Sequence, residues 1–447
     1  MIVSPAFADK RYAVLGLARS GLAAVETLLA SGAQVTAWDN RKEPREALEG
    51  RVTLGDPVGA DLSGFEGVVV SPGVPLNRHP ITEAAAKHGV PVIGDIELFA
   101  RARDALPANR VVGITGTNGK STTTALVQHL LRSAAVPVRI GGNIGVPILA
   151  QDPLPAGGVY VLELSSYQID LTHTLDCDIA VLLNVTPDHL DRYDGFESYV
   201  ASKARLFEMQ AERHLAVFGR GEAETAAVCA REAARSAQRR TVTVDGAELA
   251  ELQSDWPSLQ GPHNLQNAAA AVAIVEALGV SRQQWQAAMP RFRGLPHRME
   301  RVAEVGGVLF INDSKATNPA SAAPALAAFP PDPEPRIHWI VGGLPKGEDL
   351  GECEPHFGNV AAAYTIGDAG PAFAALLEPH TSVRRSEMMA AAIGQALEDA
   401  RPGDIVLLSP ACASFDQFRD FEARGDAFRS IVEALTEPPR IANGGGR

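Results

Sequence analysis

The chain has few cysteines, no dense block of basic residues and no long apolar segment. Its four cysteines are scattered over 447 residues and form neither a C-x-x-C pair nor a disulfide framework, which is typical of a reducing compartment. No apolar run approaches the ~20 residues that a membrane helix needs, and the N-terminus lacks the charged and apolar regions of a signal peptide. We therefore expect a cytoplasmic protein with no membrane span.

Composition narrows the class of protein further. The formal net charge is −13 and no Lys/Arg block is present, so we expect no nucleic-acid partner. Hydrophobic content of 46% and charged content of 21% are ordinary for a globular protein. At 447 residues the chain is too long for one core, and its length predicts two to four domains.

The most informative stretch is Arg-Val-Val-Gly-Ile-Thr-Gly-Thr-Asn-Gly-Lys-Ser-Thr-Thr-Thr at residues 110–124. Its β-branched run predicts a buried strand over 111–115, followed by a tight glycine turn and a helix that starts at Lys120. Glycines at 116 and 119 let backbone N–H groups approach anionic oxygens, and the helix N-terminus adds partial positive charge. Lys120 supplies a point charge and the Ser121 hydroxyl can bind Mg²⁺. The stretch therefore predicts a phosphate-binding loop.

The spacing of this loop differs from the general P-loop pattern. That pattern needs a glycine five residues before Gly119, and Ile114 stands there. A purely structural glycine turn is the alternative interpretation. Gly-Lys-Ser at a strand–helix junction favours phosphate binding over that alternative.

The N-terminal part reads as a βαβ unit, with strands over 12–15 and 34–38 and a helix over 22–30. An acidic residue, Asp39, ends the second strand about 20 residues after the glycine turn, as in a Rossmann unit, but Ala18 replaces a glycine of the dinucleotide fingerprint. A second glycine-bearing turn, Ser71-Pro-Gly73, follows the strand 67–70. A diphosphate site and a plain structural unit both remain open.

Strand–helix alternation continues to the C-terminus and predicts an α/β fold of three domains. We expect a Rossmann-like N-terminal domain over 1–98, a central P-loop-type mononucleotide-binding domain over 99–294 and a Rossmann-like C-terminal domain over 295–447. Expected strands lie at 159–164, 179–184, 308–311, 337–341 and 405–408, and expected helices at 199–211, 222–240 and 264–278. We expect a polar linker over 101–109, a stiff proline loop over 330–335 and a disordered tail over 443–447.

Polar residues gather where the expected strands end. Glu163 follows a buried strand and is suited to holding Mg²⁺ beside a phosphate loop, although capping of the next helix is the alternative. Asp188 and His189 follow another strand. Lys203, taken alone, resembles any solvated helical lysine. In the third domain, polar loops at 312–318, 342–347 and 409–416 follow three strands and indicate a second binding face.

In these motifs the chain resembles the Mur ligases, in order and over nearly its whole length. The motifs are Gly-Thr-Asn-Gly-Lys-Ser (116–121), Glu-Leu-Ser-Ser (163–166), Asn-Val-Thr-x-Asp-His-x-Asp-Arg (184–192), His-Asn (263–264), His-Arg (297–298) and Asn-Asp-Ser-Lys-Ala-Thr-Asn (312–318). The closing Ser-Pro-Ala-Cys-Ala-Ser-Phe-Asp-Gln-Phe (409–418) is similar to that of the D-glutamate-adding members.

The resemblance implies an ATP-dependent amide ligase of peptidoglycan precursor synthesis. It implies that D-glutamate is added to UDP-N-acetylmuramoyl-L-alanine through an acyl phosphate, with two Mg²⁺ sites and a CO₂-derived carbamate on Lys203. It also implies a monomer whose partners are these small molecules.

The resemblance also assigns site residues. For ATP they are Gly116, Thr117, Asn118, Gly119, Lys120, Ser121, Thr122, Asn267, His297, Arg298, Asp313 and Lys315. For the UDP-linked substrate they are Arg19, Ser20, Asn40, Arg41, Gly73, Asn143, Ser165 and His189. For the amino acid they are Thr317, Lys346, Ser414, Phe415 and Phe421. For metal they are Ser121, Glu163, His189 and carbamylated Lys203, and the catalytic set is Lys120, His189, Lys203 and Arg298.

Two other functions remain open at this point. One is a Mur-type or folylpolyglutamate-type ligase with a different amino-acid specificity, which the 409–418 motif opposes. The other is a nucleotide-binding regulator that catalyses no ligation, which has no need of His189, Lys203 or the loops of the third domain.

Overall fold

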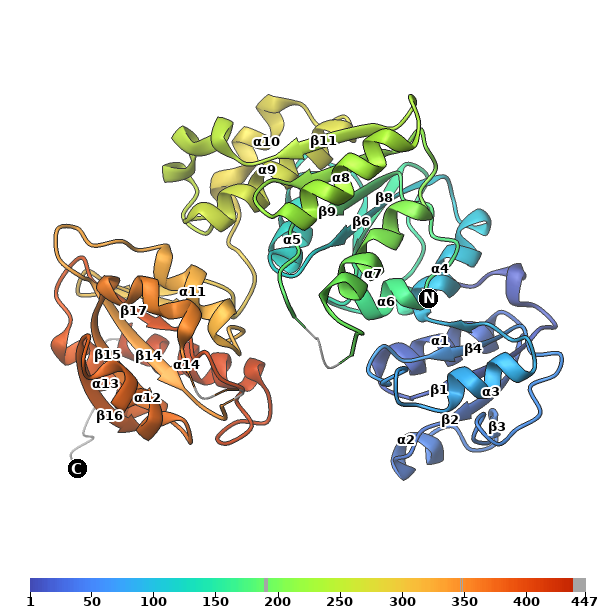
Figure 1. Ribbon diagram of the computed structural model, residues 1–447, viewed down its shortest axis with the longest axis horizontal. Coiled ribbons are helices and arrows are strands. Elements are labelled where there is room, and N and C mark those ends of the chain that lie inside the picture. The colour runs from blue at the N-terminus through green and yellow to red at the C-terminus, as the bar shows by residue number, and fades with distance from the viewer. Residues whose placement is uncertain (189–191, 346, 348, 437–447) are drawn as a thin grey trace, which may run out of the picture. The chain divides into compact units, whose positions relative to one another are not determined.

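The computed structural model describes residues 1–188, 192–345, 347 and 349–436. Within these residues the strands form three sheets, each flanked by helices (Figure 1). By packing, the chain divides into two compact units. The first consists of Met1–Ala247 with Gln266–Met289 and holds two sheets, and the second consists of Glu248–Leu265 with the chain from Pro290 onward and holds the third.

The N-terminal sheet is parallel, with the strand order β3-β2-β1-β4-β5. Its strands are β1 (Arg11–Leu15), β2 (Gln34–Trp38), β3 (Thr53–Leu54), β4 (Gly67–Val70) and β5 (Val92–Ile93). Helices α1 (Arg19–Ala30) and α4 (Asp95–Ala102) pack on one face, α3 (Ile81–Lys87) packs on the other, and α2 (Lys42–Glu46) follows β2. The strand order reverses between β1 and β4, which is where open α/β sheets bind ligands.

Two expectations for this region need correction. Helix α1 begins at Arg19, not at residue 22, so Arg19 and Ser20 lie in its first turn. The expected polar linker over 101–109 is short, because α4 extends to Ala102 and a 3-10 turn covers Arg103–Ala105. Acidic residues in the first turn of α4 complement the helix dipole. Because these charged residues interrupt the apolar periodicity, the hydrophobic pattern did not predict the helix.

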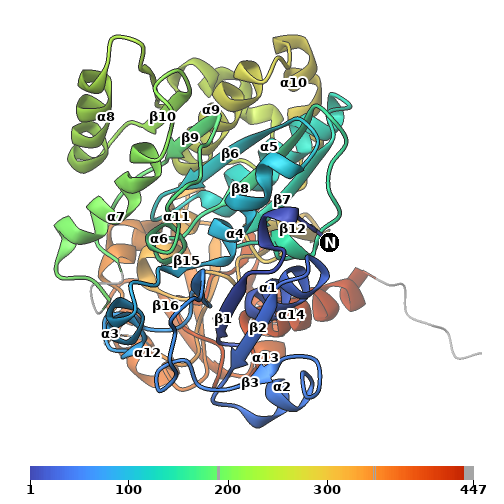
Figure 2. The ribbon, with the colours of Figure 1, turned by 90° about the vertical axis from the view of Figure 1, so that its right-hand side faces the viewer.

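The central sheet is also parallel, with the strand order β11-β10-β9-β6-β8-β7. Figure 2 labels strands β10, β9, β6, β8 and β7 of this sheet. The strands are β6 (Asn109–Thr115), β7 (Val138–Gly142), β8 (Gly158–Glu163), β9 (Ile179–Leu182), β10 (Leu215–Gly219) and β11 (Arg240–Val244). The order reverses between β6 and β9, so the phosphate loop after β6 leaves the sheet at a ligand-binding position.

The helices of the central region confirm three expected positions and correct their ends by a few residues. They are α5 (Lys120–Ser133), α6 (Ser166–Asp170), α7 (Phe196–Glu208), α8 (Ala223–Arg235), α9 (Pro262–Ala277) and α10 (Arg282–Ala288). The 3-10 segments of the chain are Pro5–Phe7, Arg103–Ala105, Ile148–Ala150, Ala247–Asp255, Met289–Arg291 and Gly351–Asn359. The expected surface helix over 222–240 ends at Arg235, since the last residues belong to β11.

The sheet of the second unit has the order β12-β13-β17-β14-β15-β16, with β12 antiparallel and the rest parallel. Its strands are β12 (Glu300–Val305), β13 (Val308–Asn312), β14 (Ile337–Gly342), β15 (Val360–Ile366), β16 (Ser382–Glu387) and β17 (Ile405–Leu408). Helices α11 (Pro319–Ala327) and α12 (Gly370–Leu377) cover one face, and α13 (Met389–Asp399) and α14 (Phe421–Thr436) cover the other.

Several remaining expectations concern segments outside the sheets. Residues 330–335 form a loop between α11 and β14, as the prolines predict. The tail 443–447 lies outside the described residues, so its expected disorder stays a prediction. Across the part of the chain that the structure describes, no helix combines the length and apolar character needed to cross a membrane.

Candidate active site

The phosphate loop lies between β6 and α5, as the sequence predicts. Gly119 has φ +82°, and a Cβ added there would lie 2.2 Å from Asn267 Oδ1. Position 119 therefore needs glycine both for its left-handed backbone and for the close approach of helix α9. Lys120 Nζ donates to the carbonyls of Gly116 (2.8 Å) and Thr117 (2.7 Å), while Ser121 and Thr122 lie in the first turn of α5.

Asn184 fixes the loop, a role that its sequence motif did not reveal. Its Oδ1 accepts from the backbone N–H groups of Thr117 (3.1 Å) and Asn118 (2.8 Å), and its Nδ2 donates to the Asn118 carbonyl (3.1 Å). Asn184 follows β9, the strand next to β6. The signal that could have identified it is an amide side chain directly after the strand beside the loop.

Glu163 ends β8, where the strand register pairs it with Ile114 of β6. Its side chain is 2% exposed; Oε1 accepts from Asn143 Nδ2 at 3.0 Å, whereas Oε2 has no hydrogen-bond partner among the described residues. A buried carboxylate oxygen without a partner is costly unless a cation or donor joins it. The arrangement is therefore suited to holding a cation at the carboxyl edge of the sheet.

Lys203 belongs to α7 and is 1% exposed, so it is not the solvated lysine that its pattern alone indicates. Its Nζ donates to the Gly116 carbonyl at 2.9 Å and lies 4.5 Å from the centre of the Tyr199 ring. Burial, and secondarily the charge of Lys120, hold the pKa of Lys203 well below its usual value. The structure thus brings Lys203 and the phosphate loop together.

Two of the predicted site residues, His189 and Lys346, lie outside the described part of the chain. In the described ranges, no group of three or more His, Cys, Asp or Glu side chains could hold a metal ion.

The two glycine turns of the N-terminal sheet lie together, as predicted. Strands β1 and β4 are neighbours, and Ser71 Oγ donates to the Gly16 carbonyl at 2.8 Å. Asp39 accepts from the Leu17 N–H (2.7 Å) and from the Arg41 guanidinium (3.1 Å), which lowers its pKa to about 2. The expected substrate residues of this edge are Arg19 and Ser20 in α1, and Asn40, Arg41 and Gly73, all three exposed.

Ser165, another predicted substrate residue, caps helix α6. Its Oγ accepts from the Gln168 N–H (3.3 Å), and the Gln168 side chain reaches back to the Ser165 N–H (3.2 Å). The residue that caps the helix after β8 is therefore Ser165, not Glu163. The Glu163 carboxylate plays no part in this cap.

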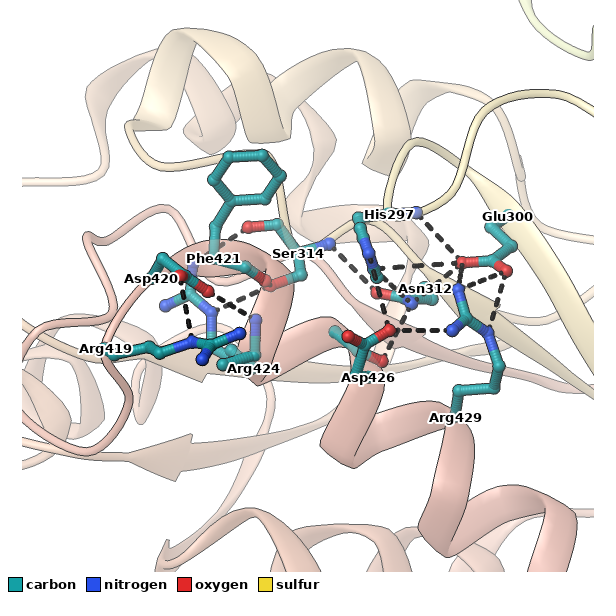
Figure 3. A network of polar contacts seen from close by, with 12 residues as sticks. His297, Glu300, Asn312, Ser314, Arg419, Asp420, Phe421, Arg424, Asp426 and Arg429 are labelled. Atoms are coloured by element: carbon teal, nitrogen blue, oxygen red, sulfur yellow. Dashed lines mark hydrogen bonds and ion pairs between the residues drawn. The ribbon is translucent and has the colours of Figure 1, made fainter. Parts of the chain in front are cut away.

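In the second unit, His297 lies inside a polar network with α14 (Figure 3). Its Nδ1 lies 3.1 Å from Asn312 Nδ2, and its Nε2 lies 3.7 Å from Asp426 Oδ1. Arg429 pairs with Glu300 at 2.8 Å, and Glu300 also accepts from Asn312 and from the His297 N–H. Burial lowers the pKa of His297, which favours the neutral imidazole.

Asp313 and Lys315 lie on the loop after β13. Asp313 accepts from Ser409 Oγ (2.8 Å) and from the Met299 N–H (3.1 Å), and burial raises its pKa to about 7. Lys315 Nζ lies 3.9 Å from the centre of the Phe421 ring, and the Lys315 backbone N–H donates to the His297 carbonyl. The predicted residues His297, Asp313, Lys315 and Phe421 therefore lie together, and Arg298 sits between His297 and Met299 in the chain.

The three polar loops of the second unit also meet. Leu344 and Ala413 exchange backbone hydrogen bonds at 2.9 and 3.0 Å, and the Asp313 N–H donates to the Leu408 carbonyl at 2.7 Å. Ser414 is buried, Thr317 is half-buried and Phe415 is 69% exposed. The loops that predict a second binding face therefore lie together, and they contact Arg424, which the sequence did not single out.

Fold and site together define a multidomain nucleotide-binding protein with a phosphate loop at the switch point of its central sheet. Three family models match the chain: "Mur ligase MurD-like, N-terminal domain" over 10–94, "Mur ligase middle domain" over 114–256 and "Mur ligase, glutamate ligase domain" over 297–412. The chain belongs to the Mur ligase family, a family of ATP-dependent amide ligases.

Similar proteins cover the chain almost completely. The UDP-N-acetylmuramoylalanine--D-glutamate ligase of Novosphingobium aromaticivorans is 67% identical over 98% of this chain and 97% of its own. The protein of the same name from Sphingopyxis alaskensis is 58% identical over 97% of this chain and 100% of its own. The MurF ligase of Thermotoga maritima, solved with ADP, shares the fold with a TM-score of 0.58 at 16% identity, covering 96% of each chain.

Proposed function

We propose that this protein is an ATP-dependent ligase that adds D-glutamate to UDP-N-acetylmuramoyl-L-alanine in peptidoglycan precursor synthesis. The observation that carries the proposal is 67% and 58% identity, over nearly the whole chain, to proteins named for that activity. The phosphate loop, with Glu163 and Lys203 at the same sheet edge, supports it.

The chemistry requires control of negative charge. The carboxylate of the UDP-linked acceptor attacks the γ-phosphorus of ATP, and ADP leaves. The amine of D-glutamate then attacks the acyl phosphate, and the tetrahedral intermediate collapses to an amide with release of phosphate. Because the first step brings two anions together, cationic groups must neutralise both.

The proposed ATP contacts follow the assignments that the Mur ligase motifs imply. Lys120 and the other backbone N–H groups of the loop hold the β- and γ-phosphates. The Thr117 and Asn118 N–H groups donate to Asn184 instead, and these two bonds fix the backbone that presents the other donors. Asn267 and His297 lie near adenine, Asp313 near the ribose, and Arg298 and Lys315 near the phosphates. Within the second unit, His297 and Asp313 are buried and held by hydrogen bonds, which supports side-chain positions that are fixed there before the nucleotide arrives.

A divalent cation fits the residues present. The unpartnered Oε2 of buried Glu163 offers a carboxylate oxygen, and Ser121 offers a hydroxyl in the first turn of α5, directly after the phosphate loop. We assign one Mg²⁺ to Ser121 and Glu163 and a second to His189 and Lys203. When bound, Mg²⁺ supplies positive charge that neutralises phosphate oxygens.

The environment of Lys203 is suited to carbamylation of its side-chain amine. Carbamylation needs a neutral amine, whose nitrogen attacks CO₂ with loss of a proton. Burial and the neighbouring Lys120 favour that neutral form. The product replaces an ammonium by a carboxylate-like group, which is an oxygen ligand for Mg²⁺.

The remaining residues bind the two substrates. The UDP part of the acceptor is held by Arg19, Ser20, Asn40, Arg41 and Gly73, and its muramoyl part by Asn143. The same UDP-linked substrate is also contacted by Ser165 and His189. D-Glutamate is held by Thr317, Lys346, Ser414, Phe415 and Phe421. We place the reaction in the cytoplasm with a monomeric enzyme.

A panel of amino acids tests the proposal directly. Phosphate release is measured with ATP, Mg²⁺ and the UDP-linked acceptor, with D-glutamate, L-glutamate, L-alanine or meso-diaminopimelate. Release only with D-glutamate is expected. Release with another amino acid alone would establish a different ligase, and nucleotide binding without release in any mixture would favour a regulator.

Lys203→Ala provides a test of the carbamate. We expect loss of nearly all activity and partial recovery in short-chain carboxylates, because a free carboxylate can occupy the space of the lost carbamate. The matched control is Lys120→Ala, which should be inactive and not recover. Full activity of Lys203→Ala without an added carboxylate would contradict the carbamate.

A further inference from the structure

Arg424 is a buried arginine at the start of α14 that binds two of the polar loops of the second unit. Its side chain is 1% exposed. Nε donates to Ser314 Oγ (3.0 Å), Nη2 to the carbonyls of Ser314 (2.9 Å) and Cys412 (3.0 Å), and Nη1 to the Ala413 carbonyl (3.1 Å). Figure 3 shows Arg424 beneath Ser314 and Phe421.

These contacts reach the third polar loop as well. The Ala413 carbonyl also accepts from the Leu344 N–H at 2.9 Å. A Cβ added at Gly343 would lie 3.1 Å from Arg424 Nη1, so the 342–344 backbone passes directly over the guanidinium. Ser314 Oγ in turn donates to the Phe421 carbonyl at 2.8 Å. One side chain therefore ties together the loops that follow β13, β14 and β17.

The charge of Arg424 has no matching carboxylate in the described chain. Its four acceptors are a hydroxyl and three carbonyls, and Asp416 acts on it only at a longer range. Burial lowers its pKa to about 10, so the group stays positive at neutral pH. A buried cation that is compensated only by dipoles is costly, and an anion bound beside these loops would reduce that cost.

We propose that Arg424 is a positioning residue for the incoming amino acid, holding the Ser414 loop in place and favouring an acidic substrate through its uncompensated charge. The inference rests on the proposed function, since it takes D-glutamate as the molecule that binds beside Ser414. Arg424 itself is buried behind the loop and acts on the substrate through Ser414 and the neighbouring backbone.

The test compares Arg424→Met and Arg424→Lys with the wild type in steady-state kinetics. Arg424→Met should raise the KM for D-glutamate by about 10- to 100-fold, the effect of losing hydrogen bonds made by a charged group. The KM values for ATP and the UDP-linked acceptor should stay within about twofold. Arg424→Lys should fall between, because it keeps the charge and loses the planar fork.

A second readout separates charge from structure. D-Glutamine has the shape of D-glutamate with one negative charge fewer, so the preference for D-glutamate should fall in Arg424→Met and persist in Arg424→Lys. Arg239→Met, which removes a buried arginine paired with Glu232 in the first unit, should lower stability without changing the KM for D-glutamate.

Each outcome decides the matter. Equal losses for all three substrates, an unchanged D-glutamate preference, or failure of both Arg424 variants to fold would overturn the inference and leave Arg424 a purely structural residue. If the wild type itself shows no D-glutamate-dependent phosphate release, the proposed function fails instead, independently of Arg424.

Discussion

At the scale of single residues, glycine is needed at position 119 for two reasons, a left-handed backbone and the close approach of Asn267. Comparison with Gly157 separates the two effects. Gly119 and Gly157 have φ +82° and +84°, but an added Cβ meets Asn267 at 119 and nothing within 4 Å at 157. Alanine at either position should cost about 1 kcal/mol of stability through its left-handed backbone. Only Gly119→Ala should also abolish ATP binding in titration calorimetry, because it displaces Asn267. Normal ATP binding by Gly119→Ala would contradict a tight cradle.

Asp95 is a buried carboxyl group whose environment predicts a pH-dependent stability. Its carboxyl is buried at the start of α4 and faces Ser20, Gln168 and the Ile96 N–H, but none of these donors forms a hydrogen bond of good geometry with it among the described residues. Burial raises its pKa from 3.8 to about 6, and the nearby donors offset that rise only in part. The folded protein therefore binds this proton more tightly than the unfolded chain, and stability falls as pH rises from about 4 to about 6.

Asp95→Asn should remove that penalty. In urea unfolding, the variant should match the wild type near pH 4 and exceed it at pH 7.5 by up to roughly 3 kcal/mol, the value of about two pKa units. Glu49→Gln, at an exposed carboxylate, should change stability at neither pH. A variant that is less stable than the wild type at pH 7.5 would show that Asp95 is ionised and well satisfied.

At the scale of elements, two capping boxes allow structure and function to be separated. Ser165 caps α6 and Ser281 caps α10 with the same Ser-x-x-Gln pattern and the same hydrogen bonds. Alanine at either position should cost about 1 kcal/mol of stability. Ser165 also lies two residues after Glu163, at the ligand-binding edge of the central sheet. Only Ser165→Ala should raise the KM for the UDP-linked acceptor, and an equal KM in both variants would remove Ser165 from the site.

At the scale of the whole molecule, the two units have separate hydrophobic cores. We expect two transitions in calorimetry, since domains with their own cores unfold as units. All the expected contacts of UDP lie in the first unit. At 100 times its Kd, UDP should stabilise that unit by about 2.7 kcal/mol and raise the midpoint temperature of one transition only. Asp95→Asn should shift the same transition and so identify it. A single transition that moves as a whole would contradict this independence.

The elements recovered from the sequence are those with a strong local pattern. Strands β2, β4 and β17 and the loop–helix junction at Lys120 lie where apolar runs and glycines predict them. Strands β11 and β16 are half-exposed edge strands, and their mixed composition carries no such pattern. Strand β10 is a buried apolar run, Leu-Ala-Val-Phe-Gly, that the same reasoning should have identified.

The sequence by itself determined the α/β class, the phosphate loop and the resemblance to a ligase family, because these depend on neighbouring residues and on motif order. Only the tertiary structure decided that Lys203 is buried against Gly116, that Asn184 clamps the loop, that Asn143 holds Glu163 and that Arg424 joins three loops. Their partners lie 11 to 110 positions away along the chain. Strand register and helix packing bring such residues together, and neither can be read from local spacing.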